Sequence, residues 1–439
     1  MKTIHQVSTS TLATLAIAIA AVGCGASDSE KPIGSPREST GVLSGTAEAS
    51  TDDVRQLVAD ETAFAVDMYG ELRKIAKDGN ILYSPHSISA ALSMTYAGAR
   101  GSTATAIAKT LRLTKPESLH SALSKLTASI APVKAPKGPV LNITNRLFGD
   151  NSLQPTQAFS NLLDRSYKAP MQRVDFRRSS EQARSTINNW VSGVTEHHIE
   201  DLMPSGSIDG STRLVLVNAV YFLANWMTPF LSEKTSDATF TRANGAKTTV
   251  KTMSEIFTLD SYYETDSFQS LRLPYTNGLL NGAADGSFEL AIALPAVGKL
   301  AQFESELTPE RIAAITKSTS ESTVSVQVRL PKFKVQGDSV PLKDALTSLG
   351  MGEAFSDFAD FSGITPNSLT LNNAFHQAMI KVDELGTEAA AATGVGSNES
   401  ISVPPANLVE FNVNRPFFIF LREAKTGLVL FMGRVSEIK

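Results

Sequence analysis

Residues that could carry out catalysis are few in this chain, and their spacing matches no catalytic motif. The sequence lacks G-x-S-x-G, H-E-x-x-H, G-x-x-x-x-G-K-[ST] and G-x-G-x-x-G, which would place a nucleophile, a zinc ion or a phosphate. Its single cysteine excludes an intrachain disulfide and a cysteine-rich zinc site. A Ser/His/Asp triad assembled from distant residues stays open as an alternative. We expect a protein that is not an enzyme and uses no cofactor.

Two adjacent histidines offer the best candidate for a metal site. His197 and His198 stand between Glu196 and Glu200, and imidazole and carboxylate groups are zinc ligands. The same pattern is typical of the solvated end of a helix, which is the interpretation that we favour, so no metal is expected. His120 is expected on a polar helix face.

The most unusual segment, residues 384–396, reads E-L-G-T-E-A-A-A-A-T-G-V-G. Its alanines favour a helix, but its three glycines disfavour one. After the first two residues, every side chain except those of Glu388 and Val395 is small. Such a segment can join a β-sheet as an extra strand, with Thr387 and every second residue after it on one face and Glu388 on the other. A flexible Ala/Gly linker is the alternative.

Both helices and strands are predicted in the rest of the chain, and these elements must position this segment. Apolar residues at helical spacing predict helices over 54–75, 87–98, 102–113, 116–130 and 180–197. Strands are predicted at 214–217, where a continuous apolar run indicates burial on both faces, and at 288–294 and 324–330, where apolar residues alternate. Residues 417–421 and 428–435 predict a terminal strand pair joined by a turn. Because helices come early and strands late, the expected fold class is α+β.

Composition sets the broad class of the protein. The 439 residues include 40 Lys and Arg against 44 Asp and Glu, a net charge of −4 that argues against a nucleic-acid partner. With 42% hydrophobic and 19% charged residues, most of the chain can bury a core. Length alone suggests roughly three domains. No linker interrupts residues 53–439, however, so we predict one large domain there.

The N-terminus has the pattern of an export signal. Lys2 precedes the apolar stretch 12–22, which is shorter than the roughly 20 residues that span a bilayer. Small residues then lead into the lone Cys24, which is similar to a bacterial lipoprotein signal, in which the cysteine becomes the lipidated first residue. We predict a signal peptide at 1–23 and an exported protein whose Cys24 is anchored at the cell envelope or cell surface.

The alternative is an ordinary signal peptide with an incidental cysteine and an extracellular product. Residues 24–52 are rich in Ser, Gly, Thr and Ala, which predicts a flexible tether between the anchor and the folded domain.

Four motifs, in order from about residue 58 to 439, resemble those of the serpins, the insertion-type serine protease inhibitors. Residues 384–393 are similar to the hinge of the serpin reactive loop. The other motifs are similar to the second helix, the central strand with Trp226 and the C-terminal strand pair, and they lie at 80–101, 217–226, 414–420 and 430–435. The resemblance implies a monomer with three β-sheets, about nine helices and an exposed reactive-centre loop.

The resemblance also implies a mechanism. A target serine protease, or alternatively a cysteine protease, cleaves the loop and forms an acyl-enzyme. The loop then inserts into the main sheet as a new strand, and the protease is carried away and distorted before water can release it. A non-inhibitory serpin fold that serves as a binding or structural module is the alternative. Members of that class tend to carry proline or bulky charged residues in the hinge, and this chain does not.

Individual roles follow from the same resemblance. The hinge comprises Glu384, Gly386, Thr387, Glu388, Ala389, Ala390, Ala391 and Ala392. The shutter, where the main sheet must part, comprises Ser84, Ser87, Asn218 and His376. A satisfied polar network without a switching role is the alternative for these four residues. Trp226 matches the breach, where insertion starts.

The reactive bond follows from counting. With Glu384 as the first residue, the seventeenth is Ser400, which places the bond at Ser400–Ile401. Counting back from the C-terminal motif allows Ser402 instead.

The residues around the reactive bond also limit the target. No lysine or arginine occurs between Val382 and Asn414, so trypsin-like proteases have no cation to bind and are expected to be poor targets. The small Ser400 favours an elastase-like or subtilisin-like protease, and Glu399 leaves room for a Glu-specific one.

Overall fold

The computed structural model describes residues 48–132, 135, 138–278, 287–317, 323–337, 339–387 and 407–438. All of them belong to the second of two compact units of the chain, Thr40–Lys439. The predicted signal peptide, Cys24 and nearly all of the predicted tether lie outside the described residues. No helix in the described part is long and apolar enough to span a bilayer.

Nine α-helices occur in the described part of the chain: α1 (Thr51–Ala76), α2 (Pro85–Gly98), α3 (Gly101–Thr110), α4 (Leu119–Ser129), α5 (Gln157–Leu162), α6 (Phe176–Val194), α7 (Leu300–Ser305), α8 (Pro309–Lys317) and α9 (Lys343–Leu346). Local chemistry sets where the first two helices begin. Ser50 and Asp53 form a reciprocal capping box before α1, and Ser84 caps α2, which has a proline in its first turn. Helix α1 therefore begins two residues before the predicted domain boundary.

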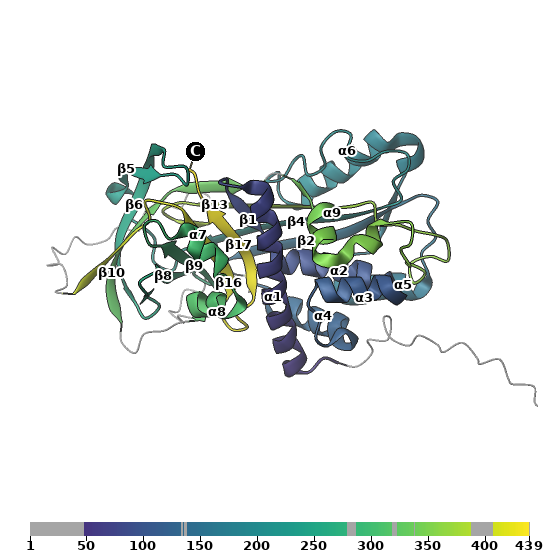
Figure 1. Cartoon of the computed structure of the whole chain (residues 1–439), viewed down its shortest axis with the longest axis horizontal. Coiled ribbons are helices and arrows are strands. Elements are labelled where there is room, and N and C mark those ends of the chain that lie inside the picture. The colour runs from purple at the N-terminus through teal and green to yellow at the C-terminus, as the bar shows by residue number, and fades with distance from the viewer. Residues whose placement is uncertain are drawn as a thin grey trace, which may run out of the picture. The chain divides into compact units, whose positions relative to one another are not determined.

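Three sheets complete the fold, which confirms the α+β class (Figure 1). The seven-stranded main sheet contains β11 (Phe333–Gln336), β13 (Asn373–Val382), β14 (Gly386–Thr387), β4 (Leu214–Asn225), β2 (Val140–Asp150) and β3 (Gln172–Val174), with β12 (Val340–Pro341) beside β13. The six-stranded sheet has the order β1 (Ile81–Tyr83), β17 (Val429–Val435), β16 (Phe417–Glu423), β9 (Phe288–Pro295), β8 (Phe268–Pro274) and β7 (Tyr263–Glu264). The four-stranded sheet has the order β15 (Leu408–Asn412), β10 (Val324–Pro331), β6 (Lys247–Leu259) and β5 (Ser236–Thr241).

The main sheet is covered on both faces, which explains the continuous apolar run in β4. Val215, Val217 and Ala219 belong to a core cluster with residues of α6, whereas Leu216 and Val220 belong to the larger core on the opposite face. Helix α2, buried along its whole length, lies on that opposite face, where its Ser87 accepts a hydrogen bond from Asn218. A strand between two covered faces favours apolar residues on both faces, and the buried Asn218 is accommodated by its hydrogen bonds.

Two expectations from the sequence are wrong in detail. His120 is 3% exposed, and its Nδ1 lies 2.6 Å from the hydroxyl of Tyr167, so it belongs to the core and not to a polar face. Strand β9 was expected to alternate, but only Glu289 is partly exposed, because other parts of the protein cover both faces of the strand.

Candidate functional site

The main sheet contains a seam between two parallel strands, β4 and β13. They pair directly from Asn373↔Val215 to Met379↔Tyr221. At the far end, β14 lies between them and is antiparallel to both, with Thr387 opposite Val382 on one side and Ala224 on the other. The first residues of the predicted hinge therefore already occupy one end of the seam, and the rest of the seam is closed.

The structure brings the four predicted shutter residues together at the seam, with a fifth residue, Asn145 of β2. We call these five the seam cluster: Ser84, Ser87, Asn145, Asn218 and His376. The backbone N–H of Ser84 donates to His376 Nε2 at 3.1 Å, and His376 Nδ1 contacts Asn218 Oδ1. Asn218 Nδ2 donates to the carbonyl of Ser87 at 2.9 Å and also contacts the Asn145 amide oxygen. The role of the cluster as a shutter stays a prediction.

The contacts of His376 fix its protonation. Because Nε2 accepts a hydrogen bond from a backbone N–H, the ring proton resides on Nδ1 and is donated to Asn218. Burial lowers the pKa of His376 to about 3. The imidazole is therefore neutral at physiological pH and joins both strands of the seam to α2.

We expect acid to destabilise the folded protein through His376. Below the ordinary histidine pKa of about 6.5 the unfolded chain binds a proton that folded His376 does not bind until about pH 3. The free energy of unfolding should therefore fall as pH drops through this window, by up to about 1.4 kcal/mol per pH unit from this group. Urea unfolding midpoints at pH 7.5 and 5.0 measure the effect.

The control for the acid effect is His376→Gln, which cannot titrate. This variant should be less stable at pH 7.5 but should lose less stability than the wild type on going to pH 5.0. An equal loss in both proteins would contradict the assignment.

The end of the seam that holds the hinge is built around Trp226. Its Nε1 donates to the carbonyl of Asp383 at 2.9 Å, and its backbone N–H donates to the carbonyl of Leu385 at 2.8 Å. The indole stacks on Tyr275, with ring centroids 4.4 Å apart. The Tyr275 hydroxyl in turn lies 2.6 Å from Thr387 Oγ1, and Thr387 is fully buried. Trp226 thus contacts the hinge segment, and its role in the breach stays a prediction.

Glu384 is held by residues that adjoin the four-stranded sheet. Its carboxylate accepts a hydrogen bond from Thr235 Oγ1 at 2.9 Å and pairs with Lys332 Nζ at 2.7 Å. Burial raises the pKa of Glu384, but the bonds from Lys332, its own backbone N–H and Thr235 outweigh burial and hold the pKa below its usual value. We call Thr235, Lys332, Trp226 and Tyr275 the hinge clasp.

Gly386 is required by the close approach of β14 to β4. A Cβ at this position would lie 2.0 Å from the carbonyl oxygen of Ala224, and the φ of 156° is one that residues with side chains rarely adopt. The remaining hinge residues, Glu388 to Ala392, lie outside the described residues. The predicted reactive bond and its alternative, Ser400, Ile401 and Ser402, lie outside them as well.

The helix that precedes the two histidines ends three residues earlier than the predicted end at His197. Helix α6 ends at Val194, and His197 follows with a φ of 65° and its Nδ1 2.9 Å from Ser192 Oγ. Within the described ranges no group of three or more His, Cys, Asp or Glu side chains could hold a metal ion.

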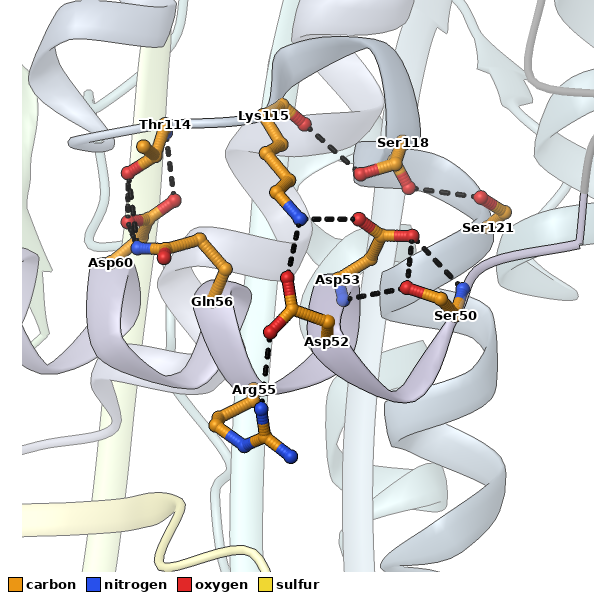
Figure 2. Close-up of polar contacts among 10 residues, drawn as sticks. All are labelled: Ser50, Asp52, Asp53, Arg55, Gln56, Asp60, Thr114, Lys115, Ser118 and Ser121. Carbon is orange, nitrogen blue, oxygen red and sulfur yellow. Dashed lines mark hydrogen bonds and ion pairs between the residues drawn. The ribbon is translucent and has the colours of Figure 1, made fainter.

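A separate polar cluster fixes the start of the domain, as Figure 2 shows. Lys115 Nζ lies 2.7 Å from Asp52 and 2.9 Å from Asp53. The hydrogen bond from Lys115, with those from Ser50, lowers the pKa of Asp53 to about 2. Lys125 Nζ donates to the carbonyl of Ala49 at 2.9 Å. The chain therefore enters the domain at a fixed place between α1 and α4.

Comparisons with known proteins agree with this architecture. The family model described as "Serpin (serine protease inhibitor)" matches residues 59–438. The leukocyte elastase inhibitors of Bos taurus and Homo sapiens are 38% and 35% identical to the chain, over 88% of it and 100% of each relative.

Solved structures give the same result. Uncleaved ovalbumin is 28% identical with a TM-score of 0.78, and covers 87% of this chain and 100% of its own. The thermophilic serpin tengpin in its native state is 27% identical, with a TM-score of 0.78. The match covers 89% of this chain and 96% of the tengpin chain.

Proposed function

Because this chain belongs to the serpin family of serine protease inhibitors, it acts on proteases as an inhibitor, and we propose that its targets are elastase-like. The observation that carries the mechanism is the occupied end of the seam. β14 is antiparallel to both β4 and β13, which is the orientation that the rest of the loop needs to continue between them. Where the loop enters, the direct pairing of β4 with β13 is replaced by two pairings, one between β4 and the loop and one between the loop and β13. Insertion therefore adds backbone hydrogen bonds.

Two observations support the choice of target. The loop between Val382 and Asn414 contains no lysine or arginine, so an acidic specificity pocket finds no partner. Relatives that match over most of the chain are named leukocyte elastase inhibitors. We propose Ser400–Ile401 as the bond that is cleaved.

We expect the wild type to form a one-to-one covalent complex with an elastase-like or subtilisin-like protease that survives SDS. Mass spectrometry of the released C-terminal peptide should show that it begins at Ile401. Trypsin serves as the matched control and should form little complex. Rapid stoichiometric trapping of trypsin by cleavage in this loop would contradict the proposed target. Cleavage by every protease tested without any covalent complex would point instead to a binding or structural role.

We also propose that the protein is a bacterial lipoprotein whose Cys24 carries the lipid. The support is the sequence pattern before Cys24, in which a short apolar stretch and small residues lead directly into the only cysteine. The proposal places the inhibitor at the cell envelope or cell surface.

Replacing the proposed anchor is expected to free the protein from membranes. Cys24→Ala should move it from the membrane fraction to the soluble fraction and abolish fatty-acid labelling. Ser27→Ala, three residues away, should change neither. A Cys24→Ala variant that still fractionates with membranes would show that the lipid anchor is wrong.

A further inference from the structure

The four-stranded sheet carries a polar groove that the insertion mechanism does not use. Its volume is about 590 Å³, and residues of β5, β6, β10 and β15 line it. Ser254, Arg329 and Asn412 lie side by side there on three neighbouring strands. The alternate residues of β10, Val326 and Val328, face the core and are fully buried. The groove is thus on the outer face of the sheet.

The two edge strands of this sheet are tied at one end. The backbone N–H of Thr241, the last residue of β5, donates to the carbonyl of Asn414 at 2.8 Å, just after the end of β15. Asn414 lines the groove as well. The hydrogen bond therefore fixes the two walls of the groove relative to each other.

The groove has a cationic and hydrogen-bonding character. Its lining includes Lys234 and Arg329 together with hydroxyl and amide side chains, but no carboxylate and no aromatic ring. Lys234 is already paired with Glu255 at 2.7 Å. Arg329, in contrast, has no side-chain hydrogen bond or ion pair with any residue in the described part of the chain. Within the described residues its charge therefore has no counter-ion and is available to an acidic partner.

The position of the groove identifies that partner. Strand β15 connects the two places: it begins at Leu408, seven residues after Ile401, and ends at Asn412, which lines the groove beside Arg329. A protease bound at the proposed reactive bond would therefore sit at the near end of the strand whose far end forms the groove. A small ligand is less well suited, because pockets for small ligands are mostly apolar and bury most of the ligand.

We propose that the groove is an accessory binding site for an acidic surface loop of the target protease, with Arg329 as its principal cation. The inference rests on the proposed inhibitory function, since it concerns how the protease approaches the loop. A free cation beside the binding site accelerates association and selects among proteases, and its effect weakens as salt screens the charges. It leaves the later insertion step unchanged.

The test uses the full-length protein and the protease, from a panel of elastase-like and subtilisin-like enzymes, that the wild type traps fastest. Association rate constants are measured at about 25, 150 and 500 mM salt for the wild type and for Arg329→Gln and Arg329→Glu. We expect Arg329→Glu to associate at least tenfold more slowly at low salt, Arg329→Gln to be intermediate, and the differences to shrink at high salt. The stoichiometry of inhibition should stay near that of the wild type.

The matched control is Lys247→Ala, which removes an exposed cation of the same sheet outside the groove and should change the rate less than twofold. Unchanged association of Arg329→Glu would overturn the proposal. Thermal unfolding in sulfate tests the alternative of a small-anion site. If sulfate stabilised the wild type but not Arg329→Glu, and the association rates of the two proteins were equal, the groove would be a small-anion site and the proposal would be overturned. Failure of the proposed function itself looks different, because the wild type would then trap none of the proteases.

Discussion

Replacing Thr387 with arginine is expected to convert the protein from an inhibitor into a substrate. Thr387 is fully buried between β4 and β13, with its hydroxyl 2.6 Å from that of Tyr275. Because this position already lies in the seam, an arginine there either buries an unpaired charge, which costs several kcal/mol, or leaves the seam and has to bury that charge when the loop inserts. Each 1.4 kcal/mol added to the barrier slows insertion about tenfold, so water hydrolyses the acyl-enzyme first.

Cleavage itself should hardly change, because Thr387 lies thirteen residues before Ser400. The measurement is the stoichiometry of inhibition against one susceptible protease. It should be near one for the wild type and should rise at least tenfold for Thr387→Arg, with cleaved loop and active protease as the products. Thr387→Ser, which keeps the hydroxyl, is the control and should still trap. Equal trapping by Thr387→Arg and the wild type would mean that insertion is not the mechanism.

Replacing Glu384 with lysine should open the hinge end of the seam and lead to oligomers. The change removes the acceptor for Thr235 and places a second cation beside Lys332, which pairs with Glu384 at 2.7 Å. When β14 leaves, β4 and β13 expose unpaired backbone groups at this end. Such strand edges pair readily with an extended segment of another molecule, here the loop that follows the hinge.

Size-exclusion chromatography after incubation at 37 °C measures the outcome, and we expect Glu384→Lys to lose monomer at least fivefold faster than the wild type. Glu384→Gln, which keeps an acceptor for Thr235 but no charge, should be intermediate. Adding Lys332→Glu to Glu384→Lys restores an opposite-charge pair and should slow the loss again. Equal rates in all four proteins would exclude a role for this ion pair.

The sequence predicted the elements with strong local patterns and missed contacts made between distant ones. Helix α2 and the terminal strand pair β16–β17 have caps, turns and apolar spacing that can be recognised locally. The strand that carries Asn145 was not expected, because most of its residues are only partly buried and their pattern is mixed. Asn145 belongs to the seam cluster only because β2 pairs with β4 in a register that places it opposite Asn218.

The hinge clasp illustrates the same limit. Trp226 could be assigned from the resemblance of its strand to the family motif. The other three residues could not be assigned in this way. Tyr275 follows β8, Thr235 precedes β5 and Lys332 follows β10, and only the folded chain brings them to the hinge. Thr235 and Tyr275 contact hinge residues more than a hundred positions away, and Lys332 contacts one 52 positions away, so no local pattern marks them.

The positions of the two tryptophans give the protein its own optical reporters. Trp226 stacks on Tyr275, which contacts the hinge, so its fluorescence should respond when further loop residues pass. The second tryptophan, Trp190 of α6, packs against Arg146 of β2, the strand beside β4. The guanidinium carbon of Arg146 lies 4.4 Å from the centroid of the Trp190 ring. One indole therefore reports on the start of loop entry and the other on the sheet beneath α6. Variants that keep a single tryptophan would time these two events separately, without an added label.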